Sequence, residues 1–90
     1  MTAQLAQRPT FKRTYKKLHP NQREAVHAAI RTILSDPEGG EAKKGDLAGV
    51  RVVKFDGIGQ TFLLAYTWDG HRCTLLSLGP HENFYRDLKR

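Results

Sequence analysis

Four cations that lie within six positions are the side chains best suited to bind an anion. They are Lys12, Arg13, Lys16 and Lys17. Because lysine and arginine neutralise phosphates, this basic cluster could dock on a nucleic-acid backbone, although a solvated helix face is the other reading of such a run. The whole chain has 15 Lys and Arg against 9 Asp and Glu, so its formal net charge of +6 favours an anionic partner such as nucleic acid, an acidic protein or a lipid surface.

The cysteine and histidine side chains give weaker indications of a chemical role. The single cysteine, Cys73, can form no internal disulfide, and its position in an apolar run predicts packing rather than nucleophilic attack. His19, His27 and His71 are expected at the surface. No Cys and His spacing fits a zinc site, so no metal and no cofactor are predicted. The lone cysteine, the lack of a signal-peptide apolar region and the lack of a membrane-length apolar stretch together predict a cytoplasmic protein with no membrane partner.

Two amphipathic helices are expected to carry the basic cluster. The first should start at Pro9, and the break at residues 19–21 starts the second, because the residue before a proline is pushed out of helical conformation. Turn formers over residues 35–40 end the second helix, so the two should form an antiparallel hairpin. The apolar faces are Phe11, Tyr15 and Leu18 in the first helix, and Ala25, Val26, Ala29, Ile30, Ile33 and Leu34 in the second.

The second half of the chain predicts a meander of strands. Aliphatic, aromatic and β-branched residues are concentrated in residues 50–55, 61–68 and 72–78. Residues 1–7 are either an edge strand or a frayed tail, and residues 81–90 read as a short helix or turn. Ninety residues provide one core, so the sequence predicts a single α+β domain in which a helical hairpin packs on a three- to four-stranded antiparallel sheet, with a short C-terminal helix.

The turns fix a testable register. A two-residue hairpin turn at Asp69-Gly70 would place Tyr66 opposite Cys73, and the looser turn before it would place Lys54 beside Thr61. Alternation then assigns two faces. The face away from the helices should carry Lys54, Thr61, Leu63, Thr67, Arg72 and Thr74, and the face that covers the helices should carry Val53, Phe62, Leu64, Tyr66 and Leu75.

This order of elements resembles the RelE/ParE superfamily, the toxins of type II toxin-antitoxin modules. Four stretches carry the resemblance, which spans about residues 9 to 90. FKRTYKKL (residues 11–18) is similar to the basic first helix of these toxins, KGDLAGVRV (44–52) to the passage into the sheet, LLAY (63–66) to the middle strand, and LGPHENFY (78–85) to the terminal stretch in which YafQ-like members carry a functional histidine and a nearby aromatic residue. The resemblance implies a RelE/ParE-like fold and a cognate antitoxin protein as partner.

For the RNA-cleaving branch, the resemblance implies an enzyme that enters the ribosome and cuts messenger RNA by attack of a ribose 2′-hydroxyl on the adjacent phosphate, without a metal. Such a reaction needs a proton acceptor, cations for the developing charge and a donor for the leaving oxygen. By match to the family pattern, His81 would act as acid or base, Lys54 and Arg72 would stabilise charge, and Tyr85 would stack on a base or donate a proton. RNA contacts would come from Arg51, Lys12, Arg13, Lys16, Lys17 and Arg86.

One departure from the pattern keeps other functions open. Many RelE-type ribonucleases carry an arginine on the middle strand, where this chain has Thr61, Phe62 and Leu63. The ParE branch shares the fold and poisons DNA gyrase without catalysis, which makes gyrase the alternative partner. An inactive homologue that only binds antitoxin is a third hypothesis. His81 could also serve as a helix cap, and Tyr85 could simply close the core.

Overall fold

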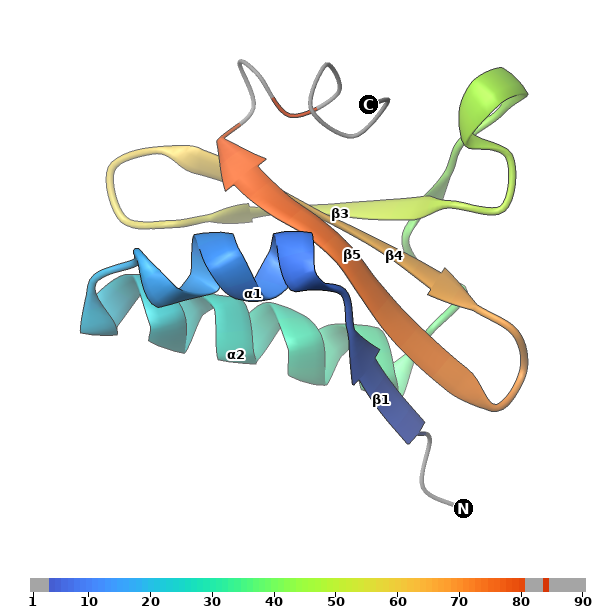
Figure 1. Cartoon of the computed structure of the whole chain (residues 1–90), viewed down its shortest axis with the longest axis horizontal. Helices are drawn as coiled ribbons and strands as arrows, with labels where there is room; N and C mark the ends of the chain where they lie inside the picture. The colour runs from blue at the N-terminus through green and yellow to red at the C-terminus, as the bar shows by residue number, and fades with distance from the viewer. Residues whose placement is uncertain (1–3, 81–83, 85–90) are drawn as a thin grey trace.

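The computed structural model describes residues 4–80 and Phe84, and its two helices pack on one face of a five-stranded sheet (Figure 1). In chain order the elements are β1 (Gln4–Gln7), α1 (Pro9–Lys16), α2 (Pro20–Ser35), β2 (Glu41–Ala42), a 3-10 turn (Gly45–Leu47), β3 (Arg51–Asp56), β4 (Thr61–Trp68) and β5 (Arg72–Pro80). The predicted α+β class and helical hairpin are confirmed. In this part of the chain, no helix is long and apolar enough to cross a membrane.

The sheet has the order β1-β5-β4-β3-β2, which adds two strands that the sequence pattern left open or missed. Segment 4–7 forms β1 and pairs parallel with β5, with Leu5 opposite Cys73. Without β1 the backbone of β5 would present unpaired hydrogen-bonding groups along a sheet edge. The expectation of three to four antiparallel strands was therefore wrong in number and partly in direction, because β2 has only two residues and a parallel pairing leaves no local signature.

Both helices begin at a proline, as expected. Proline suits the first turn because a backbone N–H there has no partner within the helix. The backbone N–H of His19 donates to Oε1 of Gln22 at 3.0 Å, which holds the start of α2. From α2, Arg23 donates through Nη2 to the carbonyl oxygen of Lys16 at 2.9 Å, so it satisfies the end of α1 and ties the two helices together.

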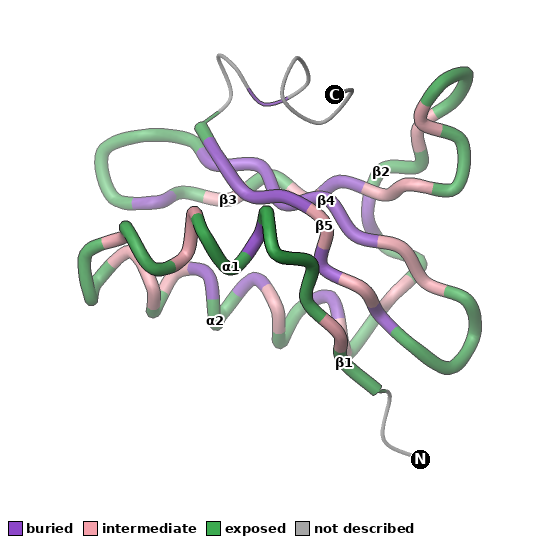
Figure 2. The backbone as a smooth tube through the Cα atoms, in the orientation of Figure 1, coloured by how far each residue is buried: buried purple, intermediate pink, exposed green. Residues whose placement is uncertain are grey.

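The main core lies between the helices and the sheet (Figure 2). Its buried members are Phe11, Val26, Ile33, Leu64, Tyr66, Cys73, Leu75 and Leu78. A second cluster comprises Val52, Leu63, Ala65 and Phe84. Since Leu63 and Ala65 alternate with Leu64 and Tyr66 along β4, this cluster occupies the face away from the helices. Of the predicted C-terminal helix, only Phe84 is described; it is helical and 2% exposed, and it covers that face.

The predicted faces are confirmed, but the predicted register is wrong. Tyr66 pairs with Leu75 instead of Cys73, and Lys54 pairs with Leu63 instead of Thr61. Both errors are two positions, and a shift of two residues preserves the face of every side chain. The turn before β5 is displaced by one residue, since the Asp69 N–H donates to the Arg72 carbonyl oxygen at 3.3 Å. The Asp69 carboxylate holds this turn by accepting hydrogen bonds from the backbone N–H groups of Arg72 at 2.7 Å and His71 at 2.9 Å. These bonds hold the pKa of Asp69 below its ordinary value.

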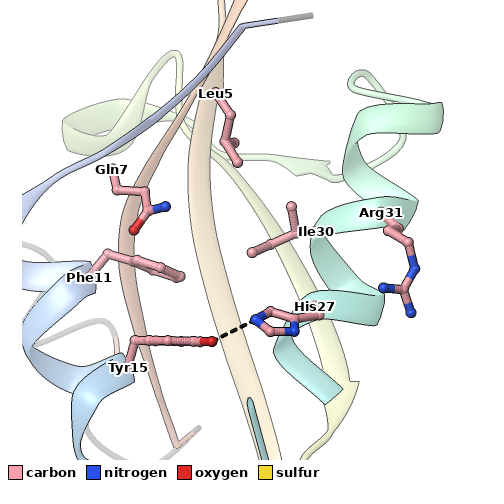
Figure 3. A pocket seen from close by; sticks show the side chains of 7 residues that line it. All are labelled: Leu5, Gln7, Phe11, Tyr15, His27, Ile30 and Arg31. Carbon is pink, nitrogen blue, oxygen red and sulfur yellow. Dashed lines mark hydrogen bonds between the residues drawn. The ribbon is translucent and has the colours of Figure 1, made fainter. Parts of the chain in front are cut away.

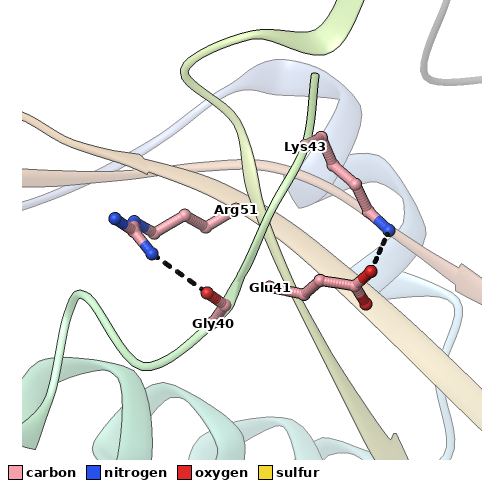
Figure 4. A network of polar contacts seen from close by, with 4 residues as sticks. All are labelled: Gly40, Glu41, Lys43 and Arg51. Carbon is pink, nitrogen blue, oxygen red and sulfur yellow. Dashed lines mark hydrogen bonds and ion pairs between the residues drawn. The ribbon is translucent and has the colours of Figure 1, made fainter.

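The connection from α2 to the sheet is fixed by two side chains. The Tyr66 hydroxyl donates to the carbonyl oxygen of Pro37 at 2.7 Å and accepts from the Gly40 N–H at 3.1 Å. Arg51 donates to the carbonyl oxygens of Glu38 at 2.8 Å and Gly40 at 3.0 Å (Figure 4). Burial raises the pKa of Tyr66. A Cβ at Gly40 would lie 2.5 Å from the Tyr66 hydroxyl oxygen, so this close approach requires glycine.

We expect Tyr66→Phe to lower the free energy of unfolding by about 1–3 kcal/mol, because it leaves a buried N–H and a carbonyl without their partner. Urea denaturation followed by circular dichroism measures this loss. Tyr15→Phe is the matched control, since its hydroxyl makes one hydrogen bond at an exposed site and should cost less. Equal losses in the two variants would contradict the role assigned to Tyr66.

Candidate functional site

The structure describes two of the four residues predicted to act in catalysis. Lys54 and Arg72 lie on the sheet, whereas His81 and Tyr85 lie outside the described residues, as does the predicted RNA contact Arg86. The position of His81 in the chain is nevertheless informative, because it directly follows Pro80, the last residue of β5.

Lys54 lies beside the point where the chain leaves β5. It is exposed on β3 and pairs with Leu63, which in turn pairs with Gly79 on the other side of β4. Since neighbouring strands are about 4.8 Å apart, the backbones of Lys54 and Gly79 are separated by about 10 Å. Alternation places the Lys54 side chain on the face away from the helices, the same face that Phe84 covers. The Lys54 ammonium group and the end of β5 therefore share one rim of the sheet.

Arg72 lies at the opposite end of the sheet. It precedes Cys73, which pairs with Trp68, and Trp68 lies five positions along β4 from Leu63, the partner of Lys54. That interval spans about 17 Å of strand. The Arg72 guanidinium donates to Oε1 of Gln4 at 3.2 and 3.3 Å, across the β1–β5 pair. The two cations predicted to stabilise charge in the reaction are thus not brought together.

The remaining predicted RNA contacts fall into two groups. Arg51 is half-buried, and its Nη1 is bonded to the carbonyl oxygens of Glu38 and Gly40, so its observed contacts are structural. The basic cluster, by contrast, is fully on the outside of α1. It consists of Lys12, Arg13, Lys16 and Lys17, and none of the four forms an ion pair within the part of the chain that the structure describes. Lys16 and Lys17 end α1 at the same end of the molecule as the β3–β4 turn (Figure 1).

A groove that the sequence reading missed lies between β1, α1 and α2 (Figure 3). Its volume is about 370 Å³, and it is lined by Leu5, Gln7, Phe11, Tyr15, His27, Ile30 and Arg31. The Tyr15 hydroxyl reaches across it to Nε2 of His27 at 2.5 Å, and the Arg23 guanidinium lies 5.4 Å from the centre of the Tyr15 ring. The groove thus combines an apolar floor with hydrogen-bonding groups and a cation, which suits a segment that is both apolar and acidic. The one feature of the sequence that could have indicated this groove is the spacing of Leu5 and Gln7, which lie two residues apart on the same face of β1.

Cys73 is packed as expected and is poorly suited to attack a substrate. Its side chain is fully buried in the main core, and burial raises the pKa of the thiol to about 11. Because the thiolate is the nucleophile, a thiol with this pKa is almost entirely unreactive near neutral pH.

Comparison with known proteins gives a family and a fold. Residues 5–89 match the model of the ParE-like toxin of type II bacterial toxin-antitoxin systems, while no curated protein is significantly similar. Among solved structures, a free-state mutant of the E. coli toxin RelE superposes with a TM-score of 0.76 at 17% identity, covering 98% of this chain and 90% of that one. The toxin-antitoxin complex RelBE2 from Mycobacterium tuberculosis gives 0.73 at 20% identity, with 90% and 100% covered. The YoeB dimer from Staphylococcus aureus gives 0.69 at 19% identity, with 90% and 99% covered.

Cys73 should resist alkylation by iodoacetamide at pH 8 in the native protein and react at once in 6 M guanidinium chloride. Its raised pKa also has a consequence for stability. Because the folded state holds the thiol proton more tightly than the unfolded chain does, this contribution is present below pH 9 and is lost as the pH rises towards about 11. A Cys73→Ala variant should lose that part of the pH dependence. Rapid alkylation of the folded wild type would show that the side chain is accessible.

Proposed function

This chain belongs to the ParE-like toxin family of type II bacterial toxin-antitoxin systems, and on that premise we propose that it stops growth by cleaving messenger RNA on the ribosome. The observation that carries the proposal is the exposed ammonium group of Lys54 on the rim of the sheet, where β5 ends directly before His81. The similarity in fold to RelE and YoeB supports it.

The chemistry assigned to this rim is attack of a ribose 2′-hydroxyl on the neighbouring phosphate. His81 would accept the hydroxyl proton, and Lys54 would stabilise the charge that develops on the phosphate oxygens. Tyr85 would stack on a base or donate a proton to the leaving oxygen. Arg72 has no part in this proposal, because about 17 Å of strand separates its end of the sheet from Lys54.

The basic cluster on α1 would supply affinity for the RNA backbone. Its four side chains are exposed, and two of them lie at the end of the molecule that carries the β3–β4 turn. Each phosphate that a protein neutralises releases counterions, so binding through these cations should weaken steeply as salt increases.

The groove between β1, α1 and α2 is our candidate site for the antitoxin. The solved relative RelBE2 is a toxin-antitoxin complex, and the groove offers an apolar floor at Phe11 and Ile30 with the cation Arg31 at its rim. An antitoxin segment that alternates apolar and acidic residues would complement both features and the net charge of +6.

Poisoning of DNA gyrase is the second candidate function. It is favoured by the separation of Arg72 from Lys54, which leaves a single described cation at the proposed catalytic rim, and by the apolar residues Phe62 and Leu63 on β4. A toxin that acts by binding alone would need no converging cations.

We expect Lys54→Ala to reduce message cleavage on the order of 100-fold, because a lost charge-stabilising group costs about that much in rate. Primer extension on a reporter message after induction in cells measures the cuts. His81→Ala should abolish them, and Arg72→Ala should leave them close to the wild-type level. Full cleavage by the Lys54 and His81 variants would overturn the catalytic assignment.

The same experiment separates the two candidate functions. Growth arrest with intact message would redirect the assignment to gyrase, where DNA cleavage complexes should then accumulate. Intact message without growth arrest would leave only an inactive antitoxin-binding role.

Arg31→Glu should weaken neutralisation by the cognate antitoxin while leaving growth arrest intact, because it reverses the charge at the groove rim. Growth rescue on co-expression of the antitoxin is the measurement. Arg72→Glu provides the matched control, as it makes the same reversal at an exposed arginine outside the groove lining. Equal rescue of both variants would place the antitoxin elsewhere.

A further inference from the structure

The turn between β3 and β4 contains a residue in an unfavourable conformation. Ile58 has φ +62°, and among the described residues it is the one non-glycine with a positive φ. Gly59 follows at φ +87°, and the Gly57 N–H donates to the Gln60 carbonyl oxygen at 2.8 Å. Ile58 and Gly59 are therefore the central residues of a two-residue hairpin turn with positive φ at both positions, as in a type I′ turn. Asparagine, aspartate and glycine suit such a position, whereas a β-branched side chain there is strained.

Ile58 is also exposed, at 54% of its possible surface. Its neighbours Gly57 and Gly59 have no side chains, and Asp56 and Gln60 are polar, so a single apolar group stands alone at the tip. The base of the turn is fixed, since a Cβ at Gly57 would lie 1.9 Å from the Phe62 ring and the Ile58 N–H donates to Oδ1 of Asp56 at 3.2 Å. Among the described residues, no packing of the Ile58 side chain offsets the strain of its positive φ, which points to a contact outside the molecule.

The surroundings of the tip indicate the kind of contact. The turn lies at the end of the molecule where Lys16 and Lys17 close α1, and Lys54 stands on the strand that leads into it (Figure 1). A protein partner of ordinary stability needs an interface of roughly 800 Å² on each side, which one isolated side chain among polar neighbours does not provide. A lone apolar side chain near cations fits a nucleic acid better, because such side chains pack against bases or wedge between them while the cations hold the phosphates.

We propose that Ile58 packs against a base of single-stranded RNA bound at this end of the molecule. The inference rests on the proposed function, since it adds an RNA contact at the end of the molecule where Lys54 and the end of α1 lie on opposite faces of the sheet. It assigns an affinity for bases to the turn, beside the affinity for phosphates that the basic cluster provides.

The test is fluorescence anisotropy of a 5′-labelled, mixed-sequence 20-nucleotide RNA with the purified full chain, between 50 and 200 mM salt. Ile58→Asn removes the apolar group and suits the turn, so it should weaken binding at least about fivefold at every salt concentration, with an unchanged slope of log affinity against log salt. Its Tm should equal or exceed that of the wild type. Ile58→Leu keeps an apolar side chain and should bind close to the wild-type level.

Each other outcome is decisive. Wild-type affinity in the Asn variant would overturn the inference and leave the proposed function standing, and the same result with lost growth arrest would assign Ile58 to a protein contact instead. Weaker binding accompanied by a lower Tm would show that the side chain supports the fold, which also overturns the inference. If the wild type itself does not bind the RNA, the inference fails, while the proposed function, which is cleavage on the ribosome, is decided separately by primer extension in cells.

Discussion

Burial of β4 on both faces is the constraint on which the rest of the structure depends. Residues 62–66 are buried without interruption, because the helices cover Leu64 and Tyr66 while Phe84 packs with Leu63 and Ala65 on the other face. Each such side chain contributes on the order of 2 kcal/mol through its removal from water. A charged residue at 62–65 would therefore be buried without a partner. Burial therefore excludes a middle-strand arginine at Phe62 and Leu63, whereas Thr61 is exposed and burial does not account for its lack of charge. The exposed cation of β3, Lys54, lies at the rim of the sheet.

The sheet then decides which rim residues can act together. Lys54 and Gly79 share a row across three strands, so the end of β5 lies near Lys54. Arg72 begins the same strand that ends beside Lys54, and the length of β5 separates them. Strand length therefore decides which of the predicted catalytic residues can lie together. The same row explains why the face away from the helices is only partly open: Phe84 covers the apolar centre, while Lys54 remains exposed.

What the sequence predicted and what it missed follow from the range of the interactions involved. Helix starts at Pro9 and Pro20 were predictable because proline geometry and apolar periodicity are local. The faces were predictable because alternation survives a register error of two residues, whereas the register depended on the Asp69 carboxylate, whose bonds hold the turn one residue further along the chain. The parallel β1–β5 pair joins segments more than sixty residues apart, and the groove brings together residues from three elements, β1, α1 and α2. A single sequence carries no signal for either contact. Ile58 does not match the preference of its turn for asparagine, aspartate or glycine, and only its positive φ revealed this.

Helix α1 links the two proposed binding surfaces. Its inner side gives Phe11 and Tyr15 to the groove, and its outer side carries the basic cluster, so the two surfaces are one helix diameter apart, about 10 Å. This is more than the screening length at physiological salt, about 8 Å, so a charge in the groove is largely screened from the basic cluster. An acidic segment confined to the groove would therefore leave much of the attraction of the basic cluster for RNA in place, and it would leave Lys54 uncovered as well. Neutralisation would then require that the antitoxin also cover the basic cluster or the proposed catalytic rim, because charge in the groove alone acts over too short a range.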